Sequence, residues 1–365
     1  MHLSLHRTML SYGGGLTLHT ASSGPVAGLD TLYLRLRDRD GIEAVGEVRI
    51  NIAYLNGLSP DAVLAEAQSV LQTLDLSPDP LALLADPPPA LAGAKAPVRM
   101  LIDMALHDRA AKQRGLPLAG LLGLDSSEAV AYPTNQTLFI SDDETFLAQA
   151  GAYVARGFVD LKVRIGAGDI ADDLRRITLL RQRFAANVKI AADANGAWGF
   201  EAALHHLEML APFDLSYVEQ PVAPTRLAEL ARLAEASPVP IMLDEGIDSE
   251  AAAMALATGG HRLMAHLKLV KLGGIAPTVR AARALKAEGV PIMIGQMNEG
   301  GLATAAVLHA STALKPQFAE LYGADGILAD PAEGLSYQHG TVAAPAEPGL
   351  GLAFQAGRTR TLWEN

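Results

Sequence analysis

Charged residues stand at the ends of successive short apolar runs in the second half of this 365-residue chain. The acidic ones are Asp193, Glu219 and Asp244, and the basic ones are Lys162, Arg164 and Lys268. Burying these charges together is costly unless they pair with one another or hold a metal ion. Carboxylates from neighbouring strands supply the oxygen ligands that Mg²⁺, or Mn²⁺ in its place, prefers. The pattern predicts a divalent metal site on the three acidic residues.

A metal ion flanked by cations is suited to removing a proton from the carbon next to a carboxylate. That proton is very weakly acidic, and the enediolate left behind carries two negative charges, which a divalent cation offsets. A lysine surrounded by cations has a lowered pKa and can act as the base. We therefore predict Lys268 as the main acid/base, with Lys162 and Arg164 completing the catalytic group on the other side.

These residues need a scaffold that gathers strand ends, and the chain from about residue 130 supplies one. Short apolar runs alternate with Ala/Leu-rich helical segments, which indicates parallel strands with right-handed crossovers. Eight such units close a barrel, whose chemistry lies at the carboxyl ends of its strands. The predicted strands are residues 130–133, 159–165, 188–192, 215–218, 240–243, 263–267, 291–294 and 317–319.

The first 125 residues have a different pattern. Segments 31–36 and 44–50 are typical of a β-hairpin, and helical patterns follow at 60–74, with Ser59 as N-cap, and at 97–114. We predict a capping domain of α+β type at 1–125, a barrel at 126–322 and a C-terminal segment at 323–365 that returns to the capping domain. The fold class is thus α/β, a (βα)8-type, modified TIM barrel with a capping domain built from both ends of the chain.

The strand-end motifs resemble those of the enolase superfamily, most closely its muconate lactonizing enzyme subgroup in the mandelate racemase/muconate lactonizing enzyme family. They are LKVRIG (161–166), ADAN (192–195), VEQP (218–221), LDEG (243–246), HLKLVKLGGI (266–275) and ELYG (320–323). The resemblance spans nearly the whole chain. It implies Mg²⁺ on Asp193, Glu219 and Asp244, and acid/base chemistry at Lys268. It also implies a homo-oligomer and capping loops, at 10–28 and 51–58, that cover the site.

Three positions depart from patterns found among those relatives. The second strand has Arg164 where Lys-x-Lys is usual, and arginine is too basic to accept a proton, so Arg164 is expected to clamp a carboxylate. This favours one-base chemistry through Lys268. Glu320-Leu321-Tyr322 stands where dipeptide epimerases carry Asp-x-Asp, which disfavours a dipeptide substrate. The seventh strand lacks the histidine of mandelate racemase-like relatives; His309 lies in the following helix.

Residues near the strand ends and in the capping loops are the predicted pocket. The substrate contacts are Tyr54, Thr134, Asn135, Met297, Glu299 and Glu320, with Tyr12 and Tyr322 as further candidates. Asn195 and Glu245 follow two of the metal ligands and are predicted to support the site by hydrogen bonding. The histidines His205, His206, His261 and His266 match no zinc motif and are predicted to be surface or core residues.

The composition of the chain argues against several other classes of protein. A net charge of −11 argues against a nucleic-acid-binding surface. No stretch approaches the roughly 20 apolar residues of a membrane span. With no cysteine, disulfides and thiolate chemistry are excluded. This, and the lack of a signal-like apolar run at the N-terminus, predicts a cytoplasmic protein.

We therefore expect a Mg²⁺-dependent enzyme that removes the proton α to the carboxylate of a small molecule and isomerises it, as a cycloisomerase, racemase or epimerase. A dehydratase acting on a hydroxy acid or a hydroxyproline-like compound stays open. So do a Schiff-base aldolase that uses Lys268 as nucleophile and a non-catalytic binder in which Arg164 marks lost activity. Chelator sensitivity and borohydride trapping separate the metal enzyme from the aldolase.

Overall fold

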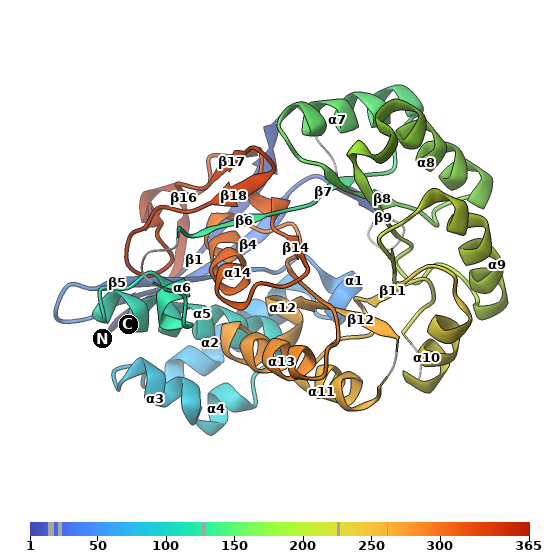
Figure 1. Cartoon of the computed structure of the whole chain (residues 1–365). Coiled ribbons are helices and arrows are strands. Elements are labelled where there is room, and N and C mark those ends of the chain that lie inside the picture. Colours follow the sequence, from blue (N-terminus) through green and yellow to red (C-terminus); the bar gives the residue numbers. More distant parts are fainter. Residues whose placement is uncertain (14–17, 21–23, 126–128, 225–226, 261) are drawn as a thin grey trace.

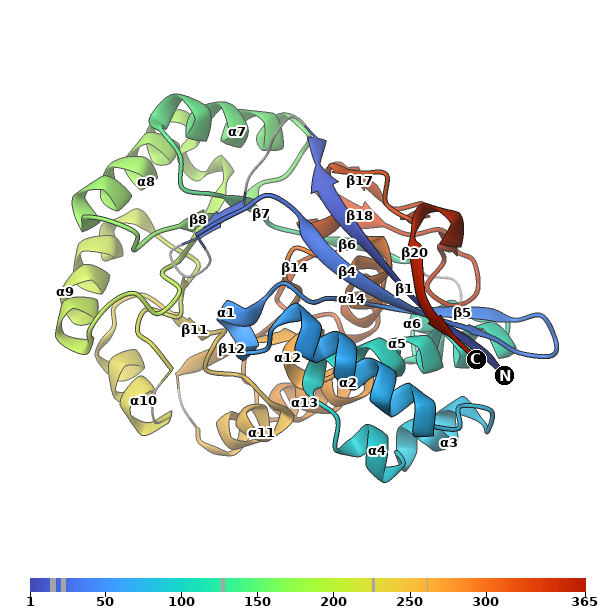
Figure 2. The ribbon, with the colours of Figure 1, turned by 180° about the vertical axis from the view of Figure 1, so that it is seen from behind.

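The computed structural model describes residues 1–13, 18–20, 24–125, 129–224, 227–260 and 262–365 (Figure 1). A barrel of alternating strands and helices lies beside a sheet covered by helices, and the two chain ends lie next to each other (Figures 1 and 2). Of the predicted capping loop at 10–28, residues 14–17 and 21–23 lie outside the described residues, as does His261. None of the described helices combines the length and apolar character that a membrane crossing needs.

Eight parallel strands form the barrel sheet, in the order β14-β13-β12-β11-β10-β9-β8-β7. The strands are β7 (Gln136–Leu138), β8 (Asp160–Arg164), β9 (Lys189–Asp193), β10 (Val218–Glu219), β11 (Ile241–Leu243), β12 (Leu263–Lys268), β13 (Ile292–Gly295) and β14 (Phe318–Glu320). The helices between them are α7 (Asp143–Ala155), α8 (Ile170–Phe184), α9 (Phe200–Leu210), α10 (Leu227–Ala236), α11 (Glu250–Thr258), the short α12 (Leu269–Leu272), α13 (Ile275–Ala287) and α14 (Gly301–Leu314). The predicted fold class is confirmed.

The first barrel strand was predicted in the wrong place. Residues 130–133 contain β6 (Ala131–Pro133), which pairs with β18 (Thr341–Ala343) in a small sheet that also holds β17 (Ser336–Gln338). The barrel begins at β7, which pairs with β8. Its sequence is Gln-Thr-Leu, and Gln136 and Thr137 are buried although polar. No apolar run marks this strand, so hydrophobic patterning selects the neighbouring segment instead.

The two edges of the barrel sheet, β7 and β14, meet at the residues just before β7. The Asn135 N–H donates to the Ala319 carbonyl at 3.1 Å, and the Leu321 N–H donates to Thr134 Oγ1 at 2.8 Å. Thr134 and Asn135 thus hold the barrel together at its seam.

The capping domain is built on the sheet β15-β1-β4-β5, with β20 also paired to β1. Its strands are β1 (His2–Tyr12), β4 (Leu29–Arg37), β5 (Glu43–Arg49), β15 (Ile327–Leu328) and β20 (Arg360–Glu364). The predicted hairpin is β4–β5, whereas β1 was not predicted. Because β15 and β20 both pair with β1, the C-terminal segment returns to this domain as expected. The residue limits assigned to the three parts stay a prediction.

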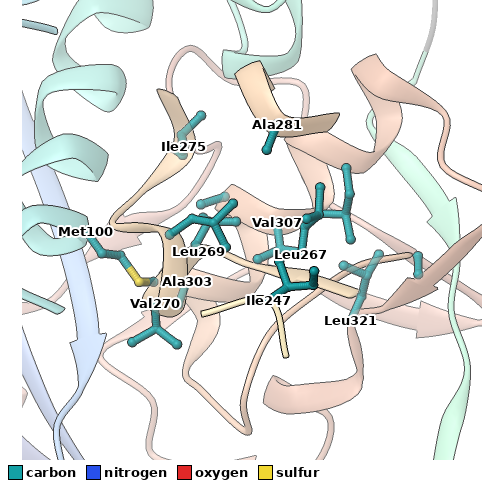
Figure 3. Packing of buried hydrophobic residues seen from close by; sticks show 14 of the residues in the cluster. Met100, Ile247, Leu267, Leu269, Val270, Ile275, Ala281, Ala303, Val307 and Leu321 are labelled. Carbon is teal, nitrogen blue, oxygen red and sulfur yellow. The ribbon is translucent and has the colours of Figure 1, made fainter. Parts of the chain in front are cut away.

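Helix α5 (Ala96–Gln113) joins this sheet to the barrel, beside α2 (Pro60–Thr73), α3 (Pro80–Ala85), α4 (Pro89–Ala92) and α6 (Leu118–Leu121). It approaches β5 so closely that a Cβ at Gly46 would lie 1.9 Å from the Leu101 carbonyl oxygen, so this position needs glycine. On its other side, Met100 packs beside Leu269 and Val270 of α12 (Figure 3). A single apolar core therefore runs through both parts of the molecule.

Two capping-domain carboxylates bind the amino ends of barrel helices. Asp103 of α5 accepts hydrogen bonds from the Ile275 N–H (2.5 Å) and the Ala276 N–H (3.3 Å) at the start of α13. Glu47 of β5 accepts three more at the start of α14, from Gly300 (2.6 Å), Leu302 (3.0 Å) and Ala303 (3.1 Å). Anions are stabilised at helix amino ends, so these contacts fix the capping domain on the barrel.

Candidate active site

The floor of the site is a ring of inward-facing residues near the carboxyl ends of the barrel strands. One layer deeper, the barrel is filled by the apolar side chains of Ala191, Tyr217, Met242, Met264, Met293 and Phe318. Side chains alternate along a strand, so the residues two positions later also face inward. They are Asp193, Glu219, Asp244, His266, Gly295 and Glu320. The barrel interior therefore changes from apolar to charged within two residues along the strands.

The three predicted metal ligands, Asp193, Glu219 and Asp244, lie together in this ring and are buried. Glu219 is level with Asp193 in the sheet, and Lys162 Nζ lies between them, 3.0 Å from Glu219 Oε2 and 3.6 Å from Asp193 Oδ2. Lys268 Nζ lies 2.7 Å from Asp244 Oδ2. The predicted residues are therefore brought together, each carboxylate beside a cation.

This donor set fits a divalent cation. Burial raises the pKa of Asp193 and of Glu219, and repulsion from neighbouring carboxylates adds to the rise. Ligand atoms of Glu219, Asp244 and His266 lie within 4.8 Å of one another. Concentrated carboxylate oxygens of this kind match the preference of Mg²⁺ and Mn²⁺.

His266 is one site residue that sequence reasoning missed, since it was predicted to be a surface or core histidine. Its Nδ1 lies 2.9 Å from Glu219 Oε1 and 3.8 Å from Asp244 Oδ1. Burial, aided by nearby Lys268, lowers its pKa well below the usual value. The available signal was its position: His266 stands two residues before Lys268 on one strand, so both side chains face inward.

Lys268, at the end of β12, reaches the floor of the cavity. Its Nζ also lies 4.0 Å from Glu320 Oε1 and 3.7 Å from Met297 Sδ. Burial acts to lower its pKa, but Asp244, Glu320 and Glu219 outweigh burial, and the net pKa is raised. The sequence predicted the opposite direction, because it counted the neighbouring cations and not the carboxylates that face the amine.

Lys162 and Arg164 lie at different depths. Lys162 is fully buried beneath the cavity, where it also contacts Glu320. Arg164 lines the cavity, contacts Asp193 and donates from Nη1 to Asn195 Oδ1 at 3.2 Å. Of the two, only the arginine is placed to meet a bound molecule.

The cavity above this floor has a volume of about 390 Å³ and is walled by both parts of the molecule. The capping wall consists of Leu18 and Val26, from β2 (Leu18–Thr20) and β3 (Gly24–Val26), Arg49 from β5, and Tyr54 and Leu55 from α1 (Ala53–Asn56). The barrel side includes Phe139, Arg164, Asn195, Asp244, Glu245, Lys268, Met297, Glu320 and Tyr322. The predicted contacts Tyr54, Met297, Glu320 and Tyr322 therefore line this cavity.

Thr134 and Asn135, predicted as substrate contacts, do not line it. They border another cavity, of about 590 Å³, together with Asp160, Lys189 and Phe318 at the amino ends of β8, β9 and β14. The prediction rested on the misplaced first strand, since both residues precede β7 instead of following it. Phe139, directly after β7, takes the expected place.

Glu299 and Tyr12 are also absent from the lining. Glu299 is fully buried behind Asn298, neither carboxylate oxygen has a hydrogen-bond partner among the described residues, and burial raises its pKa to about 7. The Tyr12 hydroxyl donates to the Gly323 carbonyl and accepts from Asn298 Nδ2 at 2.8 Å. Both residues support the wall of the cavity from behind.

Two residues that follow predicted metal ligands have left-handed backbone conformations, which are unfavourable outside glycine. Asn195 has φ 45° and its N–H donates to Asp193 Oδ1 at 2.9 Å. Gln220, at φ 39°, accepts from the Asp244 N–H at 3.0 Å through its side-chain oxygen. Asn195 Nδ2 also donates to Glu245 Oε1 at 3.2 Å, consistent with the supporting positions expected for both.

Arg49 is a buried cation on the capping wall, only 1% exposed. Its Nε donates to Asn51 Oδ1 (2.8 Å), Nη1 to the Asn298 carbonyl (3.2 Å) and Nη2 to the Asn51 carbonyl (3.4 Å). None of the ion pairs found in the described part of the chain includes it. Sequence reasoning did not select Arg49, because an arginine inside a strand of a half-buried sheet is typical of an exposed face.

Comparison with known proteins places this geometry in a family. Residues 145–357 match the family model for an enolase C-terminal domain-like region. The chain is 32% identical over 257 residues, 69% of each protein, to an L-Ala-D/L-Glu epimerase of Bacillus subtilis (strain 168). It is 29% identical over 360 residues to muconate cycloisomerase 1 of Pseudomonas putida, covering 94% of this chain and 92% of that one.

Solved structures agree. The muconate lactonizing enzyme from Pseudomonas fluorescens, in complex with muconolactone, superposes with a TM-score of 0.85 at 26% identity, covering 98% of both chains. The shared fold, the family match and the curated relatives lead to one assignment. The chain belongs to the enolase superfamily, as an enzyme similar to its muconate lactonizing members.

Proposed function

We propose that this enzyme is a divalent-metal-dependent isomerase that removes the proton α to the carboxylate of a small molecule, with Lys268 as its acid/base. The observation that carries the proposal is the placement of Lys268 Nζ on the cavity floor, 2.7 Å from a carboxylate of the buried acidic cluster. Relatives named as epimerases and cycloisomerases support the isomerase class.

Asp193, Glu219 and Asp244 would hold the metal ion, Mg²⁺ or Mn²⁺. When bound, the ion supplies positive charge that stabilises the negative charge developing on the substrate carboxylate. Asp244, Glu320 and Glu219 raise the pKa of Lys268, so a metal ion on Asp244 and Glu219 would leave the amine easier to deprotonate.

In the proposed reaction, the unprotonated amine of Lys268 takes the α-proton. The C–H bond breaks, its electron pair moves into the carboxylate as an enediolate, and the proton stays on Nζ. Return of that proton to the same face of the same carbon only regenerates the substrate. A one-base isomerisation therefore follows when the enediolate electrons form a C=C bond and expel an oxygen from the neighbouring carbon. This breaks the C–O bond of a lactone ring and gives the ring-opened isomer, and in the reverse direction Lys268 returns the proton to carbon. Arg164, which lines the same cavity as Lys268, would bind the negative charge of the substrate. It does not exchange protons, because arginine stays protonated.

A one-base enzyme follows from the two lysines. Among the described residues that line the cavity, Lys268 is the one lysine. Lys162 is fully buried and contacts Glu320 from beneath the floor. Lys162 therefore balances charge under the floor. A dehydratase needs the same first step, and loss of hydroxide from the face of Lys268 would complete it. The exchange experiment below distinguishes the two by whether a product that has lost water accumulates.

The test is incubation of the enzyme in D₂O with small carboxylates, including diacids, N-acylated amino acids and proline derivatives, followed by NMR. Mg²⁺-dependent incorporation of deuterium α to the carboxylate supports the proposal, and the compound that exchanges identifies the substrate class. Exchange that survives EDTA overturns the metal-dependent reaction. Trapping of a covalent adduct by borohydride would show a Schiff-base enzyme instead. A small carboxylate as the partner, a cytoplasmic location and a homo-oligomer remain part of the proposal.

A further inference from the structure

Glu219 is held from both sides by side chains of other strands. Lys162 Nζ lies 3.0 Å from its Oε2, and His266 Nδ1 lies 2.9 Å from its Oε1. All three side chains are fully buried. A carboxylate only accepts hydrogen bonds, so the Nδ1 of His266 carries the proton and donates it.

We propose that His266 is a positioning residue of the metal site, which fixes Glu219 in the orientation that faces Asp193 and Asp244. The inference rests on the proposed function, because Glu219 is proposed there as a metal ligand. Side chains that hydrogen-bond to a ligating carboxylate orient it and strengthen metal binding. Lys162 neutralises Glu219, whereas His266 supplies a directional bond from a rigid ring.

The neighbouring strand is built to admit that ring. A Cβ at Gly295 of β13 would lie 2.2 Å from His266 Nε2 and 2.9 Å from Glu320 Cβ. Cβ contacts this short do not occur, so the imidazole fills the space that a side chain at position 295 would need. The ring is thereby confined, and its Nε2 has no hydrogen-bond partner among the described residues. Gly295 and His266 act together as one feature.

Two other roles are possible for a buried histidine here: packing alone, or direct coordination of the metal. Packing depends on the shape of the side chain and not on its N–H. Direct coordination places the ring nitrogen on the metal, which pulsed electron paramagnetic resonance of the Mn²⁺-loaded protein detects as strong coupling to ¹⁴N. Positioning depends on the N–H and leaves that coupling absent.

The experiment measures Mg²⁺ binding to the whole protein by isothermal titration calorimetry. We expect His266→Leu to weaken Mg²⁺ binding about 10–100-fold. His266→Asn, which keeps an N–H donor, should stay within about threefold of the unchanged protein. His309→Leu is the matched control. It removes another buried histidine, which belongs to α14 and accepts a hydrogen bond from the Ala119 N–H away from the charged residues of the floor. It should leave Mg²⁺ binding unchanged.

Several results would overturn the inference. They are unchanged Mg²⁺ affinity in His266→Leu, equal loss in the Leu and Asn variants, and strong ¹⁴N coupling with Mn²⁺. If His266→Leu does not fold, Gly295→Ala decides, because it keeps the histidine but displaces its ring and should weaken Mg²⁺ binding similarly. If the unchanged protein binds no divalent cation, the proposed function fails together with this inference; if only the variants behave otherwise, the inference fails alone.

Discussion

The two walls of the cavity, which are the barrel floor and the capping wall, are built differently. The floor comes from barrel strands, and its charged groups are buried and paired, as Lys162 is with Glu219 and Lys268 with Asp244. The capping wall comes from short elements and is apolar or aromatic, at Leu18 and Tyr54 for example. Its buried cation, Arg49, bonds to amide and carbonyl oxygens. The comparison suggests that the sheet fixes the chemistry while the capping wall selects the molecule, which is how function is commonly divided between scaffold and loops.

The largest expected difference between the walls concerns stability. Lys162→Met leaves Glu219 and Glu320 buried without their shared cation and should lower the free energy of unfolding by about 3–5 kcal/mol. Arg49→Met removes a cation that has no ion-pair partner among the described residues and should cost less than half as much. Urea unfolding in EDTA measures both. Equal losses would show that the walls are not built differently.

The contact between the barrel and the capping domain at His309, which accepts a hydrogen bond from the Ala119 N–H, should make the stability of the protein sensitive to acid. Burial in α14 lowers the pKa of His309 to about 4 from 6.5. Between those pH values the unfolded chain binds a proton that the folded protein does not, so stability is full above pH 6.5 and falls as pH drops towards 4. The loss is about 3 kcal/mol. The fall in unfolding free energy from pH 7 to pH 4 should be smaller by that amount in His309→Gln; the same fall in both proteins would contradict this account.

The smallest expected effect is on substrate selection. Arg49→Met should raise KM about tenfold for a substrate whose second polar group reaches the capping wall, with kcat nearly unchanged, since a hydrogen bond to a charged group contributes about 1.5–3 kcal/mol. Steady-state kinetics on the compound found by deuterium exchange measure this effect. Leu55→Ala, on the same wall, controls for lost packing. A fall in kcat with KM unchanged would assign Arg49 to the chemistry and remove the distinction between the walls.

Much of the floor was predictable from sequence. Asp193 and Glu219 end short strands and Asp244 directly follows one. A barrel gathers strand ends, so residue type and spacing sufficed to group them. The barrel and the returning C-terminal segment followed from the alternation of strands and helices. The place of His266 in the site was not predicted, because a neutral histidine within an apolar strand does not by itself indicate a functional residue. Its inward direction follows only once that of Lys268 is known.

The remaining errors have a common physical cause. The strand β7 begins with Gln136 and Thr137, which are buried although polar, so hydrophobicity does not reveal it. That error carried Thr134 and Asn135 to the wrong end of the barrel. The raised pKa of Lys268 depends on distances to three carboxylates, which spacing along the chain does not give.

The central claim is that Lys268 on the barrel floor is the acid/base of a metal-dependent reaction. The most direct test compares α-proton exchange in D₂O for the unchanged enzyme, Lys268→Ala and Arg164→Ala, each with saturating Mg²⁺. We expect Lys268→Ala to lose exchange by about 10²–10⁴-fold while its Mg²⁺ affinity is kept, and Arg164→Ala to retain measurable exchange. Exchange that persists in Lys268→Ala, or that requires Arg164 instead, would contradict the account.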